Sequence, residues 1–287
     1  MILVINDPHM SEKPPGARNA DYMKQIVAKL VECAEISQRC DFTVITGDLY
    51  HNKNARNVTH RTVRVLIACL KLFKNVYLVE GNHDLIGAEG QSRERQPVGT
   101  LYEAGVIKRL PRMDWDGVEI FPLPYDEDFE SKKREIVLPE TKGRRIIFTH
   151  SLLTRKSGLR DRIKGQFDLC CYGHPHEPEG QDGKWVNFGA LARTRNESWE
   201  NRLVQVALVD RDLQVTSVTL ENQLPWNEVR IKPTEKEESE YDQEEFVNAF
   251  VEAMNFESMV SVSTFEEIVE NLPPKVRQRL DHYLGSL

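Results

Sequence analysis

Short apolar runs alternate with amphipathic helical patterns through the first third of the chain. Three apolar runs end at a polar residue or a glycine: Ile2–Ile5, Phe42–Ile45 and Val76–Val79. Between them, apolar residues recur at helical spacing in Tyr22–Ile36 and in Val63–Phe73. Strands that alternate with helices are typical of parallel βαβ units with right-handed crossovers. The pattern therefore predicts the beginning of a parallel sheet.

The middle of the chain is richer in expected strands. Four further runs have strand character: Val118–Phe121, Arg145–Phe148, Phe167–Tyr172 and Trp185–Phe188. Two later runs flank Asp210–Asp212 and predict a hairpin: Leu203–Val209 and Leu213–Leu220. We therefore predict an α/β or α+β fold in which two sheets meet face to face.

The last part of the chain differs in composition. Residues Lys232–Glu245 are polar and acidic, and they predict a linker or the start of a helix. Three helical stripes follow, within Phe246–Ala253, Phe265–Val269 and Val276–Leu284. We therefore divide the chain into a main domain over residues 1–231 and an acidic linker with a helical tail over 232–287. The tail is expected to pack on its own core, with docking on a partner as the alternative.

Charge is unevenly distributed, so the net charge of −7 does not decide the class of partner. From Glu228 onward, 14 acidic residues stand against 6 basic ones, whereas the preceding residues contain 31 acidic and 32 basic ones. The five cysteines show no CxxC spacing, and we expect them to be reduced, buried thiols. No apolar run reaches 18 residues, so we expect a cytoplasmic protein that does not enter a membrane.

Five short blocks of chemically reactive residues stand at or just after the ends of predicted strands. They are Asp7-Pro8-His9, Gly47-Asp48-Leu49-Tyr50-His51, Gly81-Asn82-His83-Asp84, Thr149-His150 and Gly173-His174-Pro175-His176. Together they contain six of the eight histidines of the chain. Because ligand sites in parallel sheets form outside the carboxyl ends of the strands, we expect these blocks to meet in one crevice.

The residue types in these blocks suit a pair of divalent cations. Neutral imidazole and carboxylate bind first-row divalent ions, and a two-residue step such as Asp7/His9 gives two neighbouring ligands from one loop. A shared carboxylate screens the repulsion between two cations, and Asp48 suits that role after a strand and a glycine. Each residue taken singly is explained as an ordinary polar group, but the whole set predicts a two-metal centre.

In this order, the five blocks resemble the calcineurin-like metallophosphoesterase superfamily, and the resemblance covers the chain from Asp7 to His176. GNHD and GHxH together are specific, whereas a lone Asp-X-His is not. The resemblance implies a two-sheet α/β sandwich flanked by helices, with the catalytic domain over residues 1–231. It also implies one cation on Asp7, His9, Asp48 and His176, and a second on Asp48, Asn82, His150 and His174.

The resemblance also assigns roles to three further residues. It implies that His83 contacts the substrate phosphate and assists departure of the leaving oxygen, and that Asp84 orients His83. The run from Gly47 to Lys53 resembles the SbcD-type DNA repair nucleases, the catalytic partners of SMC-like ATPases, in which the residue matching His51 acts near the scissile phosphodiester. The alternative for His51 is a hydrogen bond at the edge of the site. Gln96–Gly99 is similar to compact phage-encoded relatives.

A basic run follows His150 directly in the sequence: Arg155, Lys156, Arg160, Arg162 and Lys164. We expect it to follow a nucleic-acid backbone at the mouth of the site, because each neutralised phosphate adds salt-sensitive affinity. A solvated loop is the alternative. Arg193 and Arg195 are treated in the same way.

The sequence therefore predicts a two-metal phosphoesterase, with a DNA nuclease that uses metal-activated hydroxide as the leading hypothesis. The alternatives are a phosphatase or phosphodiesterase of nucleotides or other small phosphoesters, and a non-catalytic binding subunit. Manganese is the expected metal, with iron, zinc or cobalt as alternatives, because the ligands are nitrogen and oxygen without thiolate. DNA is the expected substrate, and an SMC-like ATPase or a second copy of the chain is the expected partner.

Overall fold

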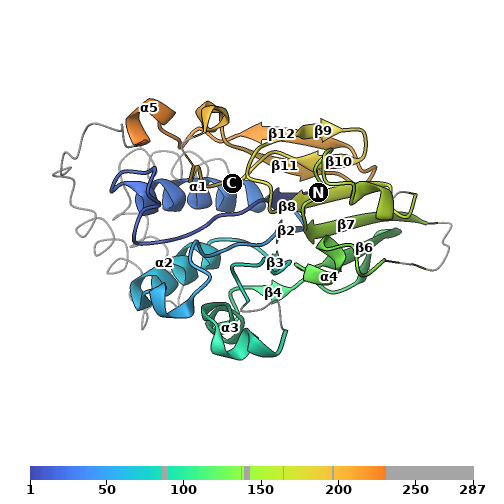
Figure 1. The fold of residues 1–287 in the computed structure, drawn as a ribbon, viewed down its shortest axis with the longest axis horizontal. Helices are drawn as coiled ribbons and strands as arrows, with labels where there is room; N and C mark the ends of the chain where they lie inside the picture. The colour runs from blue at the N-terminus through green and yellow to red at the C-terminus, as the bar shows by residue number, and fades with distance from the viewer. Residues whose placement is uncertain (86–89, 137, 139–142, 164, 196, 231–287) are drawn as a thin grey trace.

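Two six-stranded sheets form the centre of the computed structural model, which describes residues 1–85, 90–136, 138, 143–163, 165–195 and 197–230 (Figure 1). The sheets face each other, and helices cover the outer side of the first sheet. This arrangement confirms the predicted α/β sandwich. The predicted linker and tail over 232–287 lie outside the described residues.

The first sheet has the order β12-β11-β1-β2-β3-β4. Its strands, in that order, are Val215–Thr219, Gln205–Val209, Ile2–Ile5, Phe42–Ile45, Val76–Leu78 and Lys108–Arg109. Strands β1 to β4 are parallel, whereas β11 runs antiparallel to β1 and forms a hairpin with β12. The three N-terminal strands and the predicted hairpin are thus confirmed.

The second sheet has the order β5-β6-β7-β8-β10-β9. Its strands, in that order, are Met113–Trp115, Val118–Leu123, Arg144–His150, Leu169–Gly173, Trp185–Asn187 and Gly180–Asp182. The four central strands are parallel, and the antiparallel strands β5 and β9 form the edges. Both sheets therefore direct the carboxyl ends of several parallel strands into loops.

Alternation along β1 explains how the layers pack. Leu3 and Ile5 face the helices α1 (Tyr22–Ser37) and α2 (His60–Lys71), whereas Ile2 and Val4 belong to the cluster between the sheets. Because successive side chains of a strand point to opposite faces, a strand buried on both faces is apolar at every position. The four-residue apolar runs of the sequence reflect this double burial.

Short helices complete the described part of the fold. They are α3 (Pro97–Glu103), α4 (Glu127–Glu130) and α5 (Trp226–Val229), with 3₁₀ turns at Ala55–Asn57, Gly90–Arg95, Arg160–Arg162 and Ser198–Asn201. A Cβ at Gly99 in α3 would lie 2.6 Å from the carbonyl oxygen of Arg93, so the close approach of backbone requires glycine there.

Two further expectations concern the described residues. All five cysteines are buried and free, as predicted. Among the helices between residues 1 and 230, none has the length and apolar character to cross a membrane.

Candidate functional site

The five blocks meet at the carboxyl ends of strands from both sheets. Loops after β1, β2 and β3 contribute one group of side chains, and the ends of β7 and β8 contribute another. The residues brought together are Asp7, His9, Asp48, His51, Asn82, His83, His150, His174 and His176. The predicted convergence of the five blocks is therefore present, although it joins two sheets instead of lying along one.

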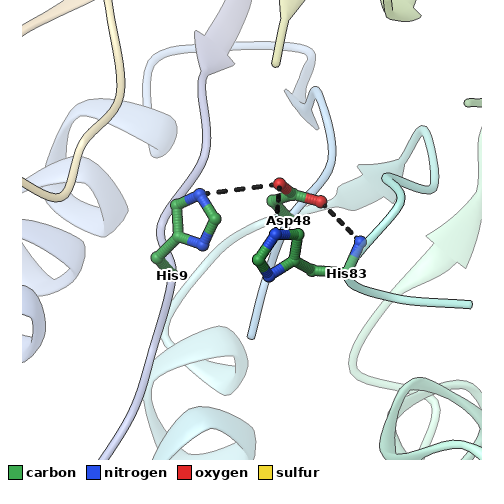
Figure 2. A group of neighbouring side chains, drawn as sticks. All are labelled: His9, Asp48 and His83. Carbon is green, nitrogen blue, oxygen red and sulfur yellow. Dashed lines mark hydrogen bonds and ion pairs between the residues drawn. The ribbon is translucent and has the colours of Figure 1, made fainter. Parts of the chain in front are cut away.

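Asp48 occupies the centre of this group and is 1% exposed. Its Oδ2 lies 3.5 Å from His9 Nε2 and 3.9 Å from His83 Nε2. Figure 2 shows both imidazole rings beside this carboxylate. Its Oδ1 lies 3.3 Å from His150 Nε2 and accepts a 2.9 Å hydrogen bond from the backbone amide of His83. The carboxylate thus has one oxygen toward each of two groups of nitrogens.

Two candidate metal-binding groups share Asp48. One contains His9 and His83, and the other contains His150 and His174; within each group the ligand atoms lie within 4.8 Å of one another. Asn82 Oδ1 lies 3.1 Å from His150 Nε2, so the amide joins the second group. A carboxylate common to two groups is the arrangement expected of a two-metal site.

The His150 ring shows how one ligand is oriented. Its Nδ1 lies 2.7 Å from the carbonyl oxygen of Thr46, to which it donates, so Nε2 faces the site. Burial lowers the pKa of His150, but the charge of Asp48 and its hydrogen bond outweigh burial and raise this pKa to about 10, so a cation bound here would replace the proton on Nε2. His174 Nδ1 lies 3.2 Å from the same Nε2. A backbone carbonyl that fixes the tautomer is the usual partner of a metal-binding imidazole.

On the other side of Asp48, His9 Nε2 lies 2.8 Å from His176 Nε2, while His9 Nδ1 is buried and has no hydrogen-bond partner among the described residues. Burial lowers the pKa of His176 to about 3, which keeps this imidazole in the neutral form that binds metals. Burial raises the pKa of Asp7 to about 8, and a neighbouring cation favours its ionised form. Imidazole nitrogens and carboxylate oxygens that converge in this way fit divalent cations with nitrogen and oxygen ligands.

The backbone of these loops is unusual. Asp7, His9, Asp48 and His174 have φ angles of 47°, 47°, 51° and 84°, in the left-handed region that side chains other than glycine seldom adopt. Each such residue costs on the order of 1–3 kcal/mol, which the surrounding structure must offset. A Cβ at Gly81 would lie 2.2 Å from Asp48 Oδ1, so glycine is required beside the shared carboxylate.

Asp84 makes contacts that differ from the expected ones. Its buried carboxylate accepts hydrogen bonds from the backbone amides of Asp48, Leu49 and Gly81 at 2.9, 2.9 and 2.8 Å. The His83 ring is oriented instead by the carbonyl oxygen of His51, which lies 2.6 Å from its Nδ1. The expectation that Asp84 orients the His83 ring is therefore corrected: Asp84 holds the loop that carries Asp48.

His51 lies beside the proposed ligands, without a place in either group of ligand atoms found among the described residues. Its ring centroid is 5.5 Å from that of His9 and 6.3 Å from that of His83. Burial lowers the pKa of His51, so the ring is neutral at neutral pH. His51 therefore lies next to the ligand groups without belonging to either of them.

The basic run after His150 is largely neutralised by acidic side chains. Arg160 is bound by Glu179 and by Asp182, and its guanidinium lies over the Trp185 ring at 4.9 Å. Arg155 Nε lies 3.0 Å from Asp182 Oδ2. These two arginines therefore anchor their own loop on the second sheet.

Of the other members of the basic run, one is held by a backbone hydrogen bond and one is exposed to solvent. Arg162 donates to the carbonyl oxygen of Arg134 at 2.7 Å, whereas Lys156 is exposed. Lys164 lies outside the described residues. Among the described members of the run, Arg155 and Arg160 thus offer a polyanion less positive charge than the sequence indicates.

Arg193 does not lie where a substrate contact would require. It is 2% exposed, donates to the carbonyl oxygen of Leu224, and packs against the Trp226 ring at 5.6 Å. The expectation that it binds substrate is therefore corrected, because a buried guanidinium cannot reach a phosphate in the crevice.

Two exposed cations, Lys53 and Arg195, contribute to the electrostatics of the site. Burial is the largest cause of the lowered pKa of His83 and of His174, and the charge of Lys53 adds to it. In the same way the charge of Arg195 adds to the effect of burial in lowering the pKa of His176. The sequence marks Lys53 only as the end of the run from Gly47, because its distance from His174 depends on the folded loops.

Tyr125 and Glu130 also border the site and have no sequence signal of their own. The Tyr125 ring centroid lies 5.7 Å from that of His174, and Glu130 Oε2 lies 3.9 Å from His174 Nε2. Both follow β6, in a stretch whose acidic residues are typical of an ordinary polar loop. Their proximity to His174 depends on β6 and β8 belonging to the same sheet, which the local sequence does not indicate.

Comparisons with known proteins were made by family, by sequence and by structure. A family model described as calcineurin-like phosphoesterase matches residues 1–253. A solved structure, that of TT1561 of Thermus thermophilus, is similar at 13% sequence identity and a TM-score of 0.43, over 76% of this chain and 97% of that one. No curated protein matches the chain.

Proposed function

Because the chain belongs to the calcineurin-like phosphoesterase family and is thereby a metal-dependent phosphoester hydrolase, we propose that it is a nuclease that cleaves backbone phosphodiesters of DNA. The observation that carries the proposal is the position of His51 beside both His9 and His83. The imidazole of His51 lies outside both ligand groups. It gives the site a contact for the second ester group of a phosphodiester, which a phosphate monoester lacks.

The two ligand groups that share Asp48 support a pair of cations, and the resemblance to the family supplies the assignment of ligands. Asp7, His9, Asp48 and His176 would hold one, and Asp48, Asn82, His150 and His174 would hold the other, with manganese as the proposed metal. When bound, the two cations lower the pKa of a water molecule and offset the charge of the phosphate oxygens. Asp48 keeps the two ligand groups at a fixed spacing, because it contacts both of them.

His83 is proposed to protonate the leaving oxygen. Its Nδ1 donates to the carbonyl oxygen of His51, so its Nε2 faces the crevice, 3.9 Å from Asp48 Oδ2. In the absence of substrate, burial lowers the pKa of His83. A bound phosphodiester adds a negative charge nearby, which favours the protonated ring and places a proton where the leaving oxygen departs.

Lys53 and Arg195 are proposed to contact substrate phosphates on either side of the scissile one. Both are exposed and both influence histidines of the site. Because a compact ammonium binds phosphate as a point charge, Lys53 contributes affinity without sequence preference. We therefore propose Lys53 and Arg195 as DNA contacts in place of Arg160, which is ion-paired.

Replacing Lys53 with glutamine is expected to weaken DNA binding and its salt dependence together. Loss of one phosphate contact lowers the slope of log Kd against log salt by about 0.9 for duplex DNA. Fluorescence anisotropy of a labelled duplex over a range of NaCl concentrations measures both effects. Arg56→Gln is the matched control, because Arg56 is exposed on the neighbouring 3₁₀ turn. An unchanged slope for Lys53→Gln contradicts this contact.

A second candidate is a phosphatase or phosphodiesterase of nucleotides or other small phosphoesters. The ion pairs of Arg155 and Arg160 favour it, because they withdraw much of the positive charge that a long polyanion would contact. Incubation with Mn²⁺ and with single-stranded or duplex DNA distinguishes the two. Intact DNA together with hydrolysis of bis-p-nitrophenyl phosphate contradicts the nuclease and supports this second function.

Addition of Mn²⁺ to metal-free protein is expected to raise the melting temperature. A ligand at one hundred times its Kd stabilises the folded state by about 2.7 kcal/mol, which corresponds to roughly 5–10 °C for a chain of this size. Differential scanning calorimetry with Mn²⁺ and then with excess chelator measures the shift and its reversal. Equal melting temperatures in the two conditions would contradict the assigned metal site.

The branch of the family and the partners are part of the same proposal. The run from Gly47 to Lys53 supports the SbcD-type branch and, with it, an SMC-like ATPase partner; the similarity to phage-encoded relatives rests on Gln96–Gly99. Size-exclusion chromatography with light scattering tests the alternative of a homodimer.

A further inference from the structure

The segment Gly189–Thr194, here called the backing segment, lies directly behind the loops that carry Asp7 and His176. Its amides donate toward those loops: Leu191 N to Asn6 O at 2.7 Å, Ala190 N to His176 O at 3.2 Å, and Ala192 N to Asp7 O at 3.4 Å. The segment therefore forms hydrogen bonds with the backbone of both loops at once.

The carbonyl groups of the backing segment accept hydrogen bonds from basic side chains on its other side. Lys29 Nζ donates to Leu191 O at 2.7 Å, Arg202 Nη2 donates to Ala190 O, and Arg18 Nη1 donates to Arg193 O at 2.8 Å. The peptide groups of the segment are thus fixed from both sides. The bonds from Arg18 and Arg202 have charged donors, and such hydrogen bonds are roughly twice as strong as neutral ones.

Lys29 is the least expected member of this layer. It lies on α1 among the apolar residues of that helix and is 0% exposed. Burial, with the charges of Arg193, Arg18 and Arg202 adding to it, lowers its pKa well below the ordinary value. A lysine at a fully buried position is costly, and an apolar residue would pack there without that cost. The hydrogen bond from Lys29 to Leu191 O is therefore what a lysine provides at this position and an apolar residue would not.

The backing segment also reaches a ligand side chain. Thr194 Oγ1 lies 3.2 Å from His176 Nδ1, so the segment holds the ring nitrogen of His176 opposite to the one that faces His9. A shift of this segment would therefore move the backbone of Asp7 and the ring of His176 together. Groups that orient metal ligands in this way typically change metal affinity by about 10–100-fold when they are lost.

We propose that Lys29 is a positioning residue for the metal centre, acting through the carbonyl group of Leu191 on Asp7 and His176. The inference rests on the proposed function, since it presumes that these two residues bind a cation. It extends that function to a side chain in the helix layer outside the first sheet, which touches neither substrate nor metal.

The test compares Lys29→Met with Glu32→Gln. Methionine keeps the length of the side chain and removes the donor. Glu32 is the matched control, because it lies one turn further along α1, is also buried, and accepts from the amides of Glu221 and Asn222, away from the site. Isothermal titration of metal-free protein with Mn²⁺ gives the affinity of each variant, and thermal unfolding without metal gives its stability.

For Lys29→Met we expect the Kd for Mn²⁺ to rise by about 10–100-fold, while Glu32→Gln keeps the wild-type Kd whatever its melting temperature. A folded Lys29→Met protein whose Kd stays within about twofold of wild type, against that expected range, overturns the inference. If Lys29→Met does not fold, Arg202→Met removes the neighbouring contact and is judged by the same limits. Wild-type protein that binds no Mn²⁺ contradicts the proposed function as well, whereas unchanged binding by the variants contradicts this inference alone.

Discussion

Replacement of Asp48 by asparagine is expected to lower kcat/KM for phosphodiester hydrolysis by on the order of a thousandfold, equivalent to about 4 kcal/mol. The carboxylate lies between the two groups of nitrogens and contacts both, so its loss removes the one negative charge that the groups share. Asparagine has nearly the same shape and preserves the buried packing of the loop. The effect should therefore appear in catalysis and in metal content, with little change in the fold.

Steady-state kinetics on bis-p-nitrophenyl phosphate and elemental analysis of the purified variant measure the two effects. Asp212→Asn provides a control for the chemical change itself, because Asp212 is exposed in the β11-β12 hairpin, far along the chain from the site residues. Circular dichroism establishes that both variants are folded. Asp48→Asn protein that keeps two metal ions and activity within about tenfold of wild type, against the expected thousandfold loss, would contradict the shared role of this carboxylate.

Replacement of His83 by glutamine is expected to reduce hydrolysis in proportion to how much the leaving group needs a proton. Loss of a general acid typically costs about 10²–10⁴-fold, and that loss should appear with DNA, whose leaving group is an alkoxide. With bis-p-nitrophenyl phosphate the loss should be much smaller, because p-nitrophenolate departs without protonation. The ratio of the two losses, measured as kcat with each substrate, reports the proton transfer itself.

The same variant also distinguishes a catalytic acid from a metal ligand. His83 lies in one candidate group with His9 and Asp48, and the ring nitrogen that faces Asp48 is not the one bound to His51. If His83 protonates the leaving oxygen, the variant keeps the wild-type metal content. Equal losses on both substrates together with a lower metal content would show that His83 binds a cation instead.

The sheets could be predicted where strands are buried on both faces. Ile2–Ile5 and Phe42–Ile45 are apolar at every position, or nearly so, because helices cover one face and the second sheet covers the other. Strands β4 and β9 showed no such pattern, because they are two and three residues long at sheet edges and carry polar side chains. Their pairing depends on neighbours that the local pattern does not contain.

The convergence of the histidines could be predicted because strand ends in parallel sheets gather in space. The partners of individual charges could not. Arg160 lies within a run of basic residues, yet its compensating carboxylates come from Glu179 and Asp182 near the second sheet's edge. Likewise, the three amides that bind Asp84 come from two different loops, so only the folded chain shows that it supports Asp48.

The division of the site between two sheets has a consequence for biosynthesis. Asp7, His9, Asp48 and Asn82 emerge early from the ribosome, whereas His150, His174 and His176 follow only after much of the second sheet has been translated, and the segment behind Asp7 ends at Thr194. Domains tend to fold from the N-terminus as they are made. A nascent chain that ends before His150 therefore carries only Asp7, His9, Asp48 and Asn82 of the proposed ligands, so the proposed centre cannot form until the second sheet has been made.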